Sequence, residues 1–431
     1  MAQIMPLAVL AFLYLTTIRI LRYNRRDKVA KSYGGTTSRS LVSMTLDEAF
    51  AIQRDLAELE FPRIFSASVF FALFKTYGVP SISSLLVATR ELADETTASK
   101  RAADTGVLLT EVVLNPPESN RTIDGIARIN FLHDRYRRAG KISDDDMLYT
   151  LSLFALEPGR WVARYDWRCL TDVERCAMGV FWRDLGQAME IPFDALGAAA
   201  GAVDGLTWLE ALDAWSGQYE KRGMRPAETN EKVARATLDI ALFNVPIWMR
   251  GFSLGLVTSL LEPRLRCAMR FQEPGRIHRL VLETVLTMRK LVVRHLCPPR
   301  PERLRSLWLT DDPDPQTGKY HALRYVAHPW YVEPNLTGRW GIVAVLLRIL
   351  RGVLPGDDAK YHPEGYLIPE LGPESMRGKG EAEMERTMSA LRKSRLARGT
   401  VHARPKEVEE RRRRKATMLN WYCDWYHPCL H

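Results

Sequence analysis

The 431-residue sequence lacks the short motifs that mark several large enzyme classes. It contains no glycine-rich phosphate loop, no HExxH zinc motif and no GxSxG turn, so nucleotide-dependent, zincin and serine-hydrolase chemistry have no support. Sustained alternation of apolar and polar residues and Asn-Gly hairpin turns are also missing, which disfavours β-structure. Only six cysteines occur, none in a CxxC pair, and this excludes a disulfide scaffold and indicates a reducing compartment.

The net charge of +10 is concentrated in two short segments. Residues 19–31 hold six basic residues against one acidic residue, and residues 386–415 hold twelve against three. The rest of the chain is therefore slightly acidic. A basic face for binding a nucleic-acid duplex is disfavoured, and no nucleic-acid partner is expected.

The only uncharged run long enough to approach a membrane span is at the N-terminus. Residues 1–18 carry no charge, and the basic residues follow this run instead of preceding it, unlike in a cleaved signal peptide. We therefore expect an uncleaved single-pass anchor. The positive-inside rule places its N-terminus in the lumen and the body of the protein in the cytosol.

The remaining sequence predicts an all-α protein whose residue composition changes from segment to segment. We expect a transmembrane anchor (1–22), a basic and polar linker (23–44), a helical core (45–300), a wrapping extension rich in proline and aromatic residues (301–374), and a basic helical tail (375–431).

Several helix starts in this core have local signals. Thr45, Ser143 and Thr171 each precede acidic first-turn residues, as N-caps do, and Pro158 favours an end near Glu157 for the helix after Ser143. The apolar runs 236–249 and 251–261 are too short to cross a bilayer and are predicted to be core helices. A short apolar helix within 341–355 either docks on the core or lies on the membrane surface.

The stretch 120–192 contains the most informative histidine. On a helix, Ile126, Ile129, Asn130 and His133 share one face, so the imidazole of His133 projects from a mostly apolar, inward stripe. Two interpretations follow. His133 is either a core histidine with a hydrogen-bonded nitrogen or a ligand of a buried group.

A second helix, within 99–114, places Arg101 and Thr105 at the head of another apolar stripe. Asp104 is near enough in sequence to pair with Arg101, which leaves open an ordinary surface salt bridge. Alternatively the two helices enclose a cofactor pocket. A haem in such a pocket would need one neutral imidazole for its iron and basic side chains for its propionates.

The C-terminal residues CDWYHPCLH bring two cysteines and two histidines close together in sequence. Their spacing matches no zinc finger, and we do not interpret Cys423, His427, Cys429 and His431 as a metal site.

The pattern Arg101-x-x-x-Thr105 followed by His133 in RINFLHDRYRRAGKISDDDMLYTLSLFALEP resembles the family that joins bacterial rubber oxygenases (latex-clearing proteins) to the fungal ER-bound oxygenase mpaB. The fungal branch is more similar. Further similar segments are FALFKTYGVPSISSLL, SKRAADT, RFQEPGR, HPWYVEPNLTGRWG and PGDDAKYHPEGY, so the resemblance covers most of the chain.

This resemblance implies a globin-like helical domain that holds haem b. By it, His133 would be the proximal ligand of the haem iron, and Arg101 and Thr105 would line the haem pocket as catalytic and cofactor-binding residues. Rubber oxygenases carry a lysine just before the threonine, whereas this chain has Asp104 there, which puts a distal lysine ligand in doubt. By its position in the motif, Asp104 is expected to be a catalytic residue together with Arg101 and Thr105. Their catalytic glutamate has no clear match, since Glu91 and Glu95 are at a different spacing.

The function implied by the resemblance is oxidative cleavage of a carbon–carbon double bond, using molecular oxygen, in a hydrophobic prenylated substrate at the endoplasmic reticulum membrane. Fungal-type secondary-metabolite biosynthesis is the implied setting. Two alternatives remain: a haem oxidase that hydroxylates or epoxidises without cleavage, and a non-catalytic, membrane-anchored helical scaffold.

Overall fold

A computed structural model describes residues 4–33, 40–89, 95–356 and 358–399. In these residues the chain is helical, which confirms the predicted all-α class. The described part contains no strand, and its only β-pairing consists of the isolated bridges Leu309–Ala322 and Tyr320–Tyr366.

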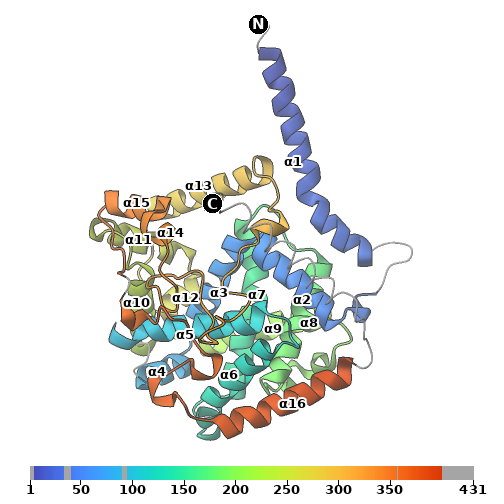
Figure 1. Cartoon of the computed structure of the whole chain (residues 1–431), viewed down its shortest axis with the longest axis vertical. Helices are drawn as coiled ribbons and strands as arrows, with labels where there is room; N and C mark the ends of the chain where they lie inside the picture. Colours follow the sequence, from blue (N-terminus) through green and yellow to red (C-terminus); the bar gives the residue numbers. More distant parts are fainter. Residues whose placement is uncertain (1–3, 34–39, 90–94, 357, 400–431) are drawn as a thin grey trace, which may run out of the picture.

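The centre of the molecule is a bundle of long helices (Figure 1). Helix α3 (Pro62–Thr76) packs along α7 (Asp144–Tyr165), and α8 (Asp172–Ala188) packs on both α9 (Gly205–Gly223) and α2 (Leu46–Asp55). One large hydrophobic cluster joins these helices. Their inward faces are apolar at helical spacing, so burial of these faces drives the association.

The predicted helix starts are confirmed. Thr45 and Thr171 form complete capping boxes with the glutamates three residues later, and the Ser143 hydroxyl accepts a bond from the Asp146 amide at 3.0 Å. The predicted end of α7 at Glu157 is wrong, because the helix continues through Pro158 to Tyr165. Burial of the last turns outweighs the hydrogen bond that the proline removes.

Four helices beside this bundle position the predicted site. They are α4 (Pro80–Thr89), α5 (Glu95–Leu114), α6 (Asn120–Arg138) and α10 (Glu228–Ala241), with α5 packed against both α6 and α10. Gly125 permits the close approach of α5 and α6, since a Cβ there would lie 2.8 Å from Val112 Cγ1.

Helices α11 (Ile247–Leu260), α12 (Pro263–Ala268) and α13 (Arg276–His295) continue the chain. The prediction that the runs 236–249 and 251–261 are core helices is confirmed for one face of α11 only, whose Leu254, Val257 and Leu260 pack against the core. The other face lies at the surface, where Ile247 and Trp248 are 80% and 70% exposed. An apolar run indicates that its side chains are shielded from water. The sequence alone does not say whether the protein core or another surface shields them.

The segment from Pro298 to Gly380 follows the outside of α5 and α6. It contributes Leu309, Tyr331, Tyr366 and other residues to a second apolar cluster, together with Val107, Leu108 and Leu132 of α5 and α6. It includes the short helices α14 (Leu336–Trp340) and α15 (Ile342–Ile349). The remaining short elements of the described chain are Leu41–Ser43, Leu56–Glu60 (a π-turn), Asp194–Gly201 (two 3-10 turns joined at Gly197), Glu302–Leu304, Ala359–Tyr361, Ile368–Glu370 and Glu374–Met376.

The last described element, α16 (Glu381–Gly399), lies along α6, and an ion pair of 3.0 Å between Arg395 and Asp184 ties it to α8. The rest of the predicted basic tail, including the terminal cysteines and histidines, is outside the described residues.

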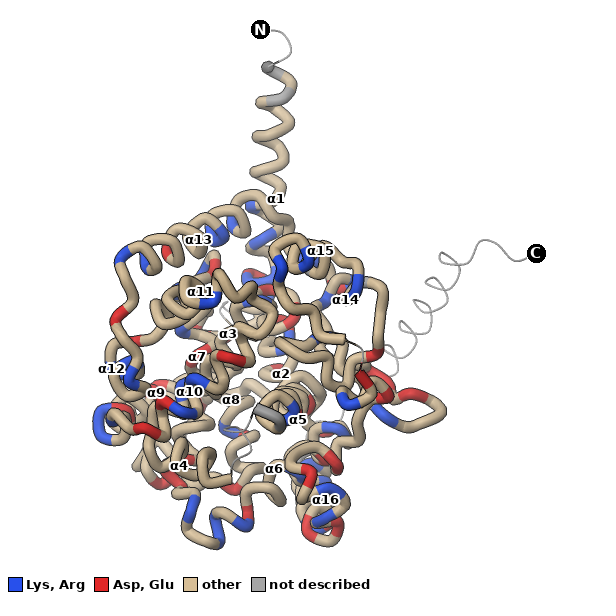
Figure 2. Tube along the Cα trace, turned by 90° about the vertical axis from the view of Figure 1, so that its left-hand side faces the viewer, with Lys and Arg blue, Asp and Glu red and all other residues tan. Residues whose placement is uncertain are grey.

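Helix α1 (Ile4–Tyr33) projects from one end of the body (Figures 1 and 2). Its C-terminal half is fastened to the body, with Arg22 Nη2 donating to the Cys297 carbonyl at 2.6 Å and Arg25 pairing with Glu60 at 3.0 Å. Within the described chain no single helix meets the length and hydropathy criteria for a membrane span, whereas α3 and α4, bent by 90° at their junction, meet them as a pair.

Candidate active site

His133 lies near the C-terminal end of α6, a helix whose start is fixed by the Ser119 hydroxyl, which accepts a bond from the Thr122 amide. Its side chain is half-buried, and its Nδ1 atom is buried without a hydrogen-bond partner. Such an orphaned polar atom costs about 1–3 kcal/mol unless a bound group satisfies it. No protein atom of the described chain makes a hydrogen bond to this nitrogen, so it is available to a bound group.

The electrostatic surroundings keep this imidazole neutral. Burial, together with the positive charges of Arg101 and Arg137, lowers the pKa of His133 to about 4. A neutral imidazole with a free nitrogen is the form that binds a metal ion. His133 is therefore competent as a ligand at physiological pH.

Arg101 and Thr105 are on α5, one helical turn apart. Arg101 Nη1 donates to Thr105 Oγ1 at 3.4 Å, and the Thr105 hydroxyl donates to the Arg101 carbonyl at 2.9 Å. The positive charge of Arg101 acts on the imidazole of His133, because it helps to lower the pKa of that ring. The fold thus places the three residues of the predicted motif in one electrostatic neighbourhood.

The expected salt bridge between Arg101 and Asp104 does not form. Asp104 instead pairs with Lys100 at 3.1 Å and accepts a hydrogen bond of 2.6 Å from the Tyr331 hydroxyl. No carboxylate of the described chain pairs with Arg101. Arg101 therefore presents a half-buried cation that is free to hold an anionic group.

Asp104 itself is 1% exposed, and burial raises its pKa although Lys100 and Tyr331 oppose that shift. Its contacts join α5 to the wrapping extension. The geometry gives this carboxylate a structural connection to Tyr331, and the catalytic role expected from its position in the motif stays a prediction. Of the two glutamates considered as a base, Glu91 is outside the described residues and Glu95 begins α5.

One further residue near this site was missed by the sequence analysis. Tyr77, at the C-terminal end of α3, is 2% exposed, and burial raises its pKa to about 12 although a hydrogen bond with Thr237 and the charge of Arg101 lower it. A protonated phenol near the same arginine is a possible proton donor. No local signal marks it, because its neighbours come from α5 and α10.

A buried ionic cluster on the other side of α3 was also missed. Lys75 lies 3.1 Å from Glu157 and 3.0 Å from Glu220, and Arg160 pairs with Glu157 at 2.8 Å. Every charge here has a partner, so the cluster joins α3, α7 and α9 and leaves no group available for chemistry.

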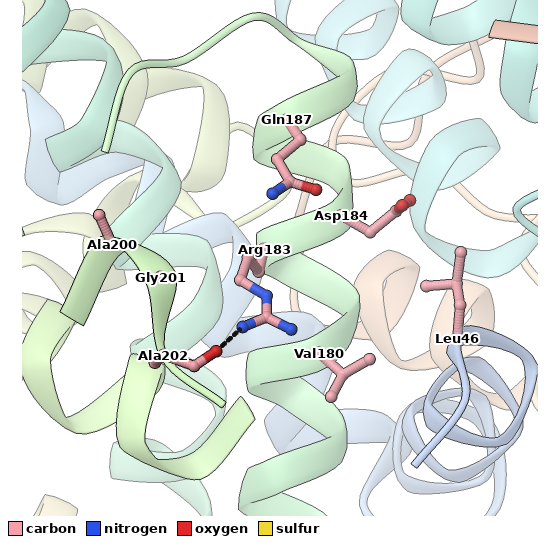
Figure 3. A pocket seen from close by; sticks show the side chains of 8 residues that line it. All are labelled: Leu46, Val180, Arg183, Asp184, Gln187, Ala200, Gly201 and Ala202. Atoms are coloured by element: carbon pink, nitrogen blue, oxygen red, sulfur yellow. Dashed lines mark hydrogen bonds between the residues drawn. The ribbon is translucent and has the colours of Figure 1, made fainter. Parts of the chain in front are cut away.

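Two hollows on the described chain lie away from the predicted residues. A hollow of about 350 Å³ is lined by residues of α2, α8 and the turn Asp194–Gly201, and in it Arg183 donates to the Ala202 carbonyl at 2.7 Å (Figure 3). Another, of about 470 Å³, lies beside α14 and α15. The first has an arginine, an aspartate and a glutamine along its wall, which does not suit a prenyl chain.

The donor set can be tested against the expected cofactor. No group of three or more histidine, cysteine, aspartate or glutamate side chains is arranged to hold a metal ion in the part of the chain that the structure describes. A metal held mainly by protein ligands therefore does not fit there. A haem does fit these residues, because its porphyrin supplies four nitrogens and needs only one imidazole, with a cation for its propionates.

Comparison with known proteins places the chain among curated relatives. The ER-bound oxygenase mpaB′ of Penicillium brevicompactum is 39% identical over 391 residues, which cover 90% of this chain and 92% of the relative. The ER-bound oxygenase mpaB of the same species is 38% identical over 354 residues, covering 82% and 84%. Its namesake from Penicillium roqueforti is 42% identical over 261 residues, covering 60% and 88%. No family model matches the chain.

Proposed function

Because the chain belongs to the mpaB family of ER-bound oxygenases and is an oxidoreductase, we propose that it is a membrane-anchored, haem-dependent oxygenase that cleaves a carbon–carbon double bond of a prenylated small molecule. Family membership favours an enzyme over the non-catalytic scaffold. The proposed cofactor is haem b, and the relation to bacterial rubber oxygenases stays a prediction.

The observation that carries the proposal is the unpartnered, neutral imidazole of His133 beside the unpaired Arg101. His133 would bind the haem iron through a ring nitrogen. Its low pKa means that protons do not compete for this nitrogen at neutral pH. When bound, the haem supplies the binding and activation of molecular oxygen.

Arg101 would pair with a haem propionate, because this half-buried cation has no carboxylate partner and an arginine forms charge-assisted hydrogen bonds with a carboxylate. Thr105 holds the Arg101 backbone and receives a hydrogen bond from its guanidinium, so it orients the arginine. In this assignment Asp104 supports α5 from the outside. Tyr77 is the candidate for delivering a proton near Arg101.

The proposed reaction balances without an added reductant. The C=C bond and the O–O bond break, two C=O bonds form, and each carbonyl product receives one oxygen atom of O₂. Hydroxylation or epoxidation would place only one oxygen atom in the product, and two electrons from a reductant would be needed to reduce the other to water. The two chemistries therefore differ in isotope content and in reductant demand.

We also propose that the protein resides in the endoplasmic reticulum membrane through a single span formed by the start of α1. The first 18 residues are uncharged, and residues 19–31 are strongly basic. This charge order supports a lumenal N-terminus and a cytosolic body. A hydrophobic substrate partitions into the same bilayer, so the anchor raises its concentration near the enzyme. Secondary-metabolite biosynthesis is the proposed setting.

The test is the visible absorption spectrum of the full-length protein, purified in detergent from haem-replete cells. We expect a Soret band with one haem per chain, lost or shifted in His133→Ala and retained in the matched control His321→Ala. Arg101→Ala should release haem more readily than Arg101→Lys, which keeps the charge. A colourless parent protein, or an unchanged spectrum in His133→Ala, would contradict the proposal.

Once haem is established, incubation with ¹⁸O₂ and prenylated test compounds separates the chemistries. Cleavage predicts one labelled oxygen in each of two carbonyl products without an electron donor. A single labelled hydroxyl or epoxide that forms only with a reductant would identify the haem oxidase alternative.

A further inference from the structure

Three surface segments expose large apolar side chains on one end of the body. We call the exposed faces of α11, α13 and residues 336–353 the apolar platform. On it Ile277 is 69% exposed, Trp340 is 67% exposed and Ile342 is 81% exposed. Outside α1 and the platform, the exposed large apolar residues of the described chain are scattered: Val42, Val203, Leu304, Leu323, Val326 and Leu396.

The platform is continuous across its helices. Helix α11 packs along α13, and the Trp248 indole on α11 donates to the Leu350 carbonyl just after α15 at 3.4 Å. Trp248 and Trp340 are both on the platform, and they are the only exposed tryptophans of the described chain. Tryptophan is enriched where protein meets the membrane–water interface.

The platform lies at the end of the body from which α1 projects. Figure 1 shows α13 reaching toward α1, with α11 and α15 farther away on the opposite side, and Figure 2 shows all three near the end that carries α1. The Tyr14 hydroxyl donates to the Leu296 carbonyl at 2.9 Å, so the end of α13 touches α1 within its uncharged half. Tyr14 precedes Arg19 by five residues, which is about 7.5 Å along a helix.

This contact indicates how far below the membrane surface the platform would lie. If Arg19 lies at the membrane surface, the end of α13 lies about 7.5 Å below it, which is within the roughly 5–10 Å to which interfacial helices are immersed. The platform residues next to α13 would then contact the boundary between head groups and acyl chains.

The charges of the platform fit a membrane surface. Helix α11 and residues 336–353 contain no acidic residue, and α13 contains only Glu283. Helix α11 contains one basic residue, the half-buried Arg250, whereas α13 and residues 336–353 carry several, among them the exposed Arg276, Arg294, Arg348 and Arg351. Figure 2 shows blue basic positions on α13 and around α14 and α15. Anionic head groups attract such residues while the apolar side chains enter the lipid.

We propose that the apolar platform is a membrane-docking surface that rests in the cytosolic leaflet beside the anchor. The inference rests on the membrane anchoring proposed above and goes beyond it. The body itself then lies in the membrane–water interface at a fixed orientation, whereas the anchor alone would leave its orientation free. A second copy of the chain is a poorer occupant. Two platforms stacked by a two-fold axis would point their α1 helices in opposite directions, away from a common bilayer.

The test uses full-length protein reconstituted into vesicles of phosphatidylcholine and phosphatidylinositol, with or without brominated acyl chains that quench nearby tryptophan. Two of the 11 tryptophans are on the platform, so we expect bromine to quench about a fifth of the emission, more strongly at shallow than at deep acyl positions. Trp248→Phe/Trp340→Phe should abolish most of this quenching. The matched control Trp208→Phe, which changes a fully buried tryptophan, should retain it.

Vesicle flotation measured on the same samples separates this inference from the anchor. Protein that floats but shows the same quenching with and without Trp248 and Trp340 would overturn the platform and leave the anchor in place. Protein that does not float would overturn both. A detergent-free dimer whose platform tryptophans are shielded from bromine would identify a second copy as the occupant and would also overturn the proposal.

Discussion

The contact between Asp104 and Tyr331 provides a sharp test of the site described above. The motif position of Asp104 predicts a pocket group, whereas the fold directs its carboxylate to a tyrosine 227 residues away in sequence, at 2.6 Å. We expect Tyr331→Phe to destabilise the protein, because it leaves a 1%-exposed carboxylate with Lys100 as its remaining partner. A hydrogen bond to a charged group contributes about 1.5–3 kcal/mol.

The magnitude follows from a double-mutant cycle. Asp104→Leu alone leaves the Tyr331 hydroxyl buried without an acceptor and should cost about 1–3 kcal/mol. The double variant Asp104→Leu/Tyr331→Phe removes both polar groups and should be destabilised by less than the sum of the single changes, with a coupling energy of about 1.5–3 kcal/mol. In thermal unfolding this coupling corresponds to about 2–4 °C, since unfolding entropy is roughly 2.1 cal/mol/K per residue.

The stability of the same variants should also depend on pH. Burial holds the pKa of Asp104 above its ordinary value of 3.8, so the folded protein binds this proton more tightly than the unfolded chain. The contribution of Asp104 to stability is therefore most favourable below pH 3.8 and declines as pH rises through the raised pKa. Asp104→Leu should remove this part of the slope.

The decisive comparison is between stability and the haem spectrum. If Asp104 supports α5 from outside, the variants lower the melting temperature and leave the Soret position of the surviving folded protein unchanged. Additive single losses together with a shifted Soret band in Asp104→Leu would refute this reasoning and return Asp104 to the pocket.

Two further predictions concern groups buried in the helical bundle. In haem-free protein, stability should fall as pH decreases from 6.5 towards about 4, because the unfolded chain accepts the proton that buried His133 does not; subtracting the pH profile of His133→Phe isolates this loss. Lys75→Met leaves Glu157 and Glu220 buried without their lysine and should cost about 3–5 kcal/mol, whereas the exposed-pair control Arg175→Met should cost less than about 1 kcal/mol. Equal melting temperatures for these last two variants would contradict the structural role of the cluster.

Much of the local structure was predictable from the sequence, because its causes lie within a few residues. Thr45 and Thr171 cap α2 and α8 through glutamates three positions later. The helical period that puts His133 on the same face as Ile126 requires no knowledge of the fold. Patterns of this kind established the all-α class, and the Arg101, Thr105 and His133 motif identified the family later supported by its relatives.

The tertiary structure decided what each of these side chains touches. Sequence spacing allowed Asp104 to pair with Arg101, and only the extension packed on α5 supplies the Tyr331 that draws it away. The free cation of Arg101, the lone nitrogen of His133 and the nearby Tyr77 all depend on contacts between separate helices.

The apolar runs also show which structural features local sequence determines and which depend on long-range packing. Composition predicted that 236–261 and 341–355 favour burial, since transfer of apolar side chains out of water is favourable. Whether they enter the protein core or face outward depends on which surfaces are already filled. The bundle of α3, α7, α8 and α9 forms much of the core, and α11 packs on it with one face only, so the other face of α11 and most of α15 remain at the surface.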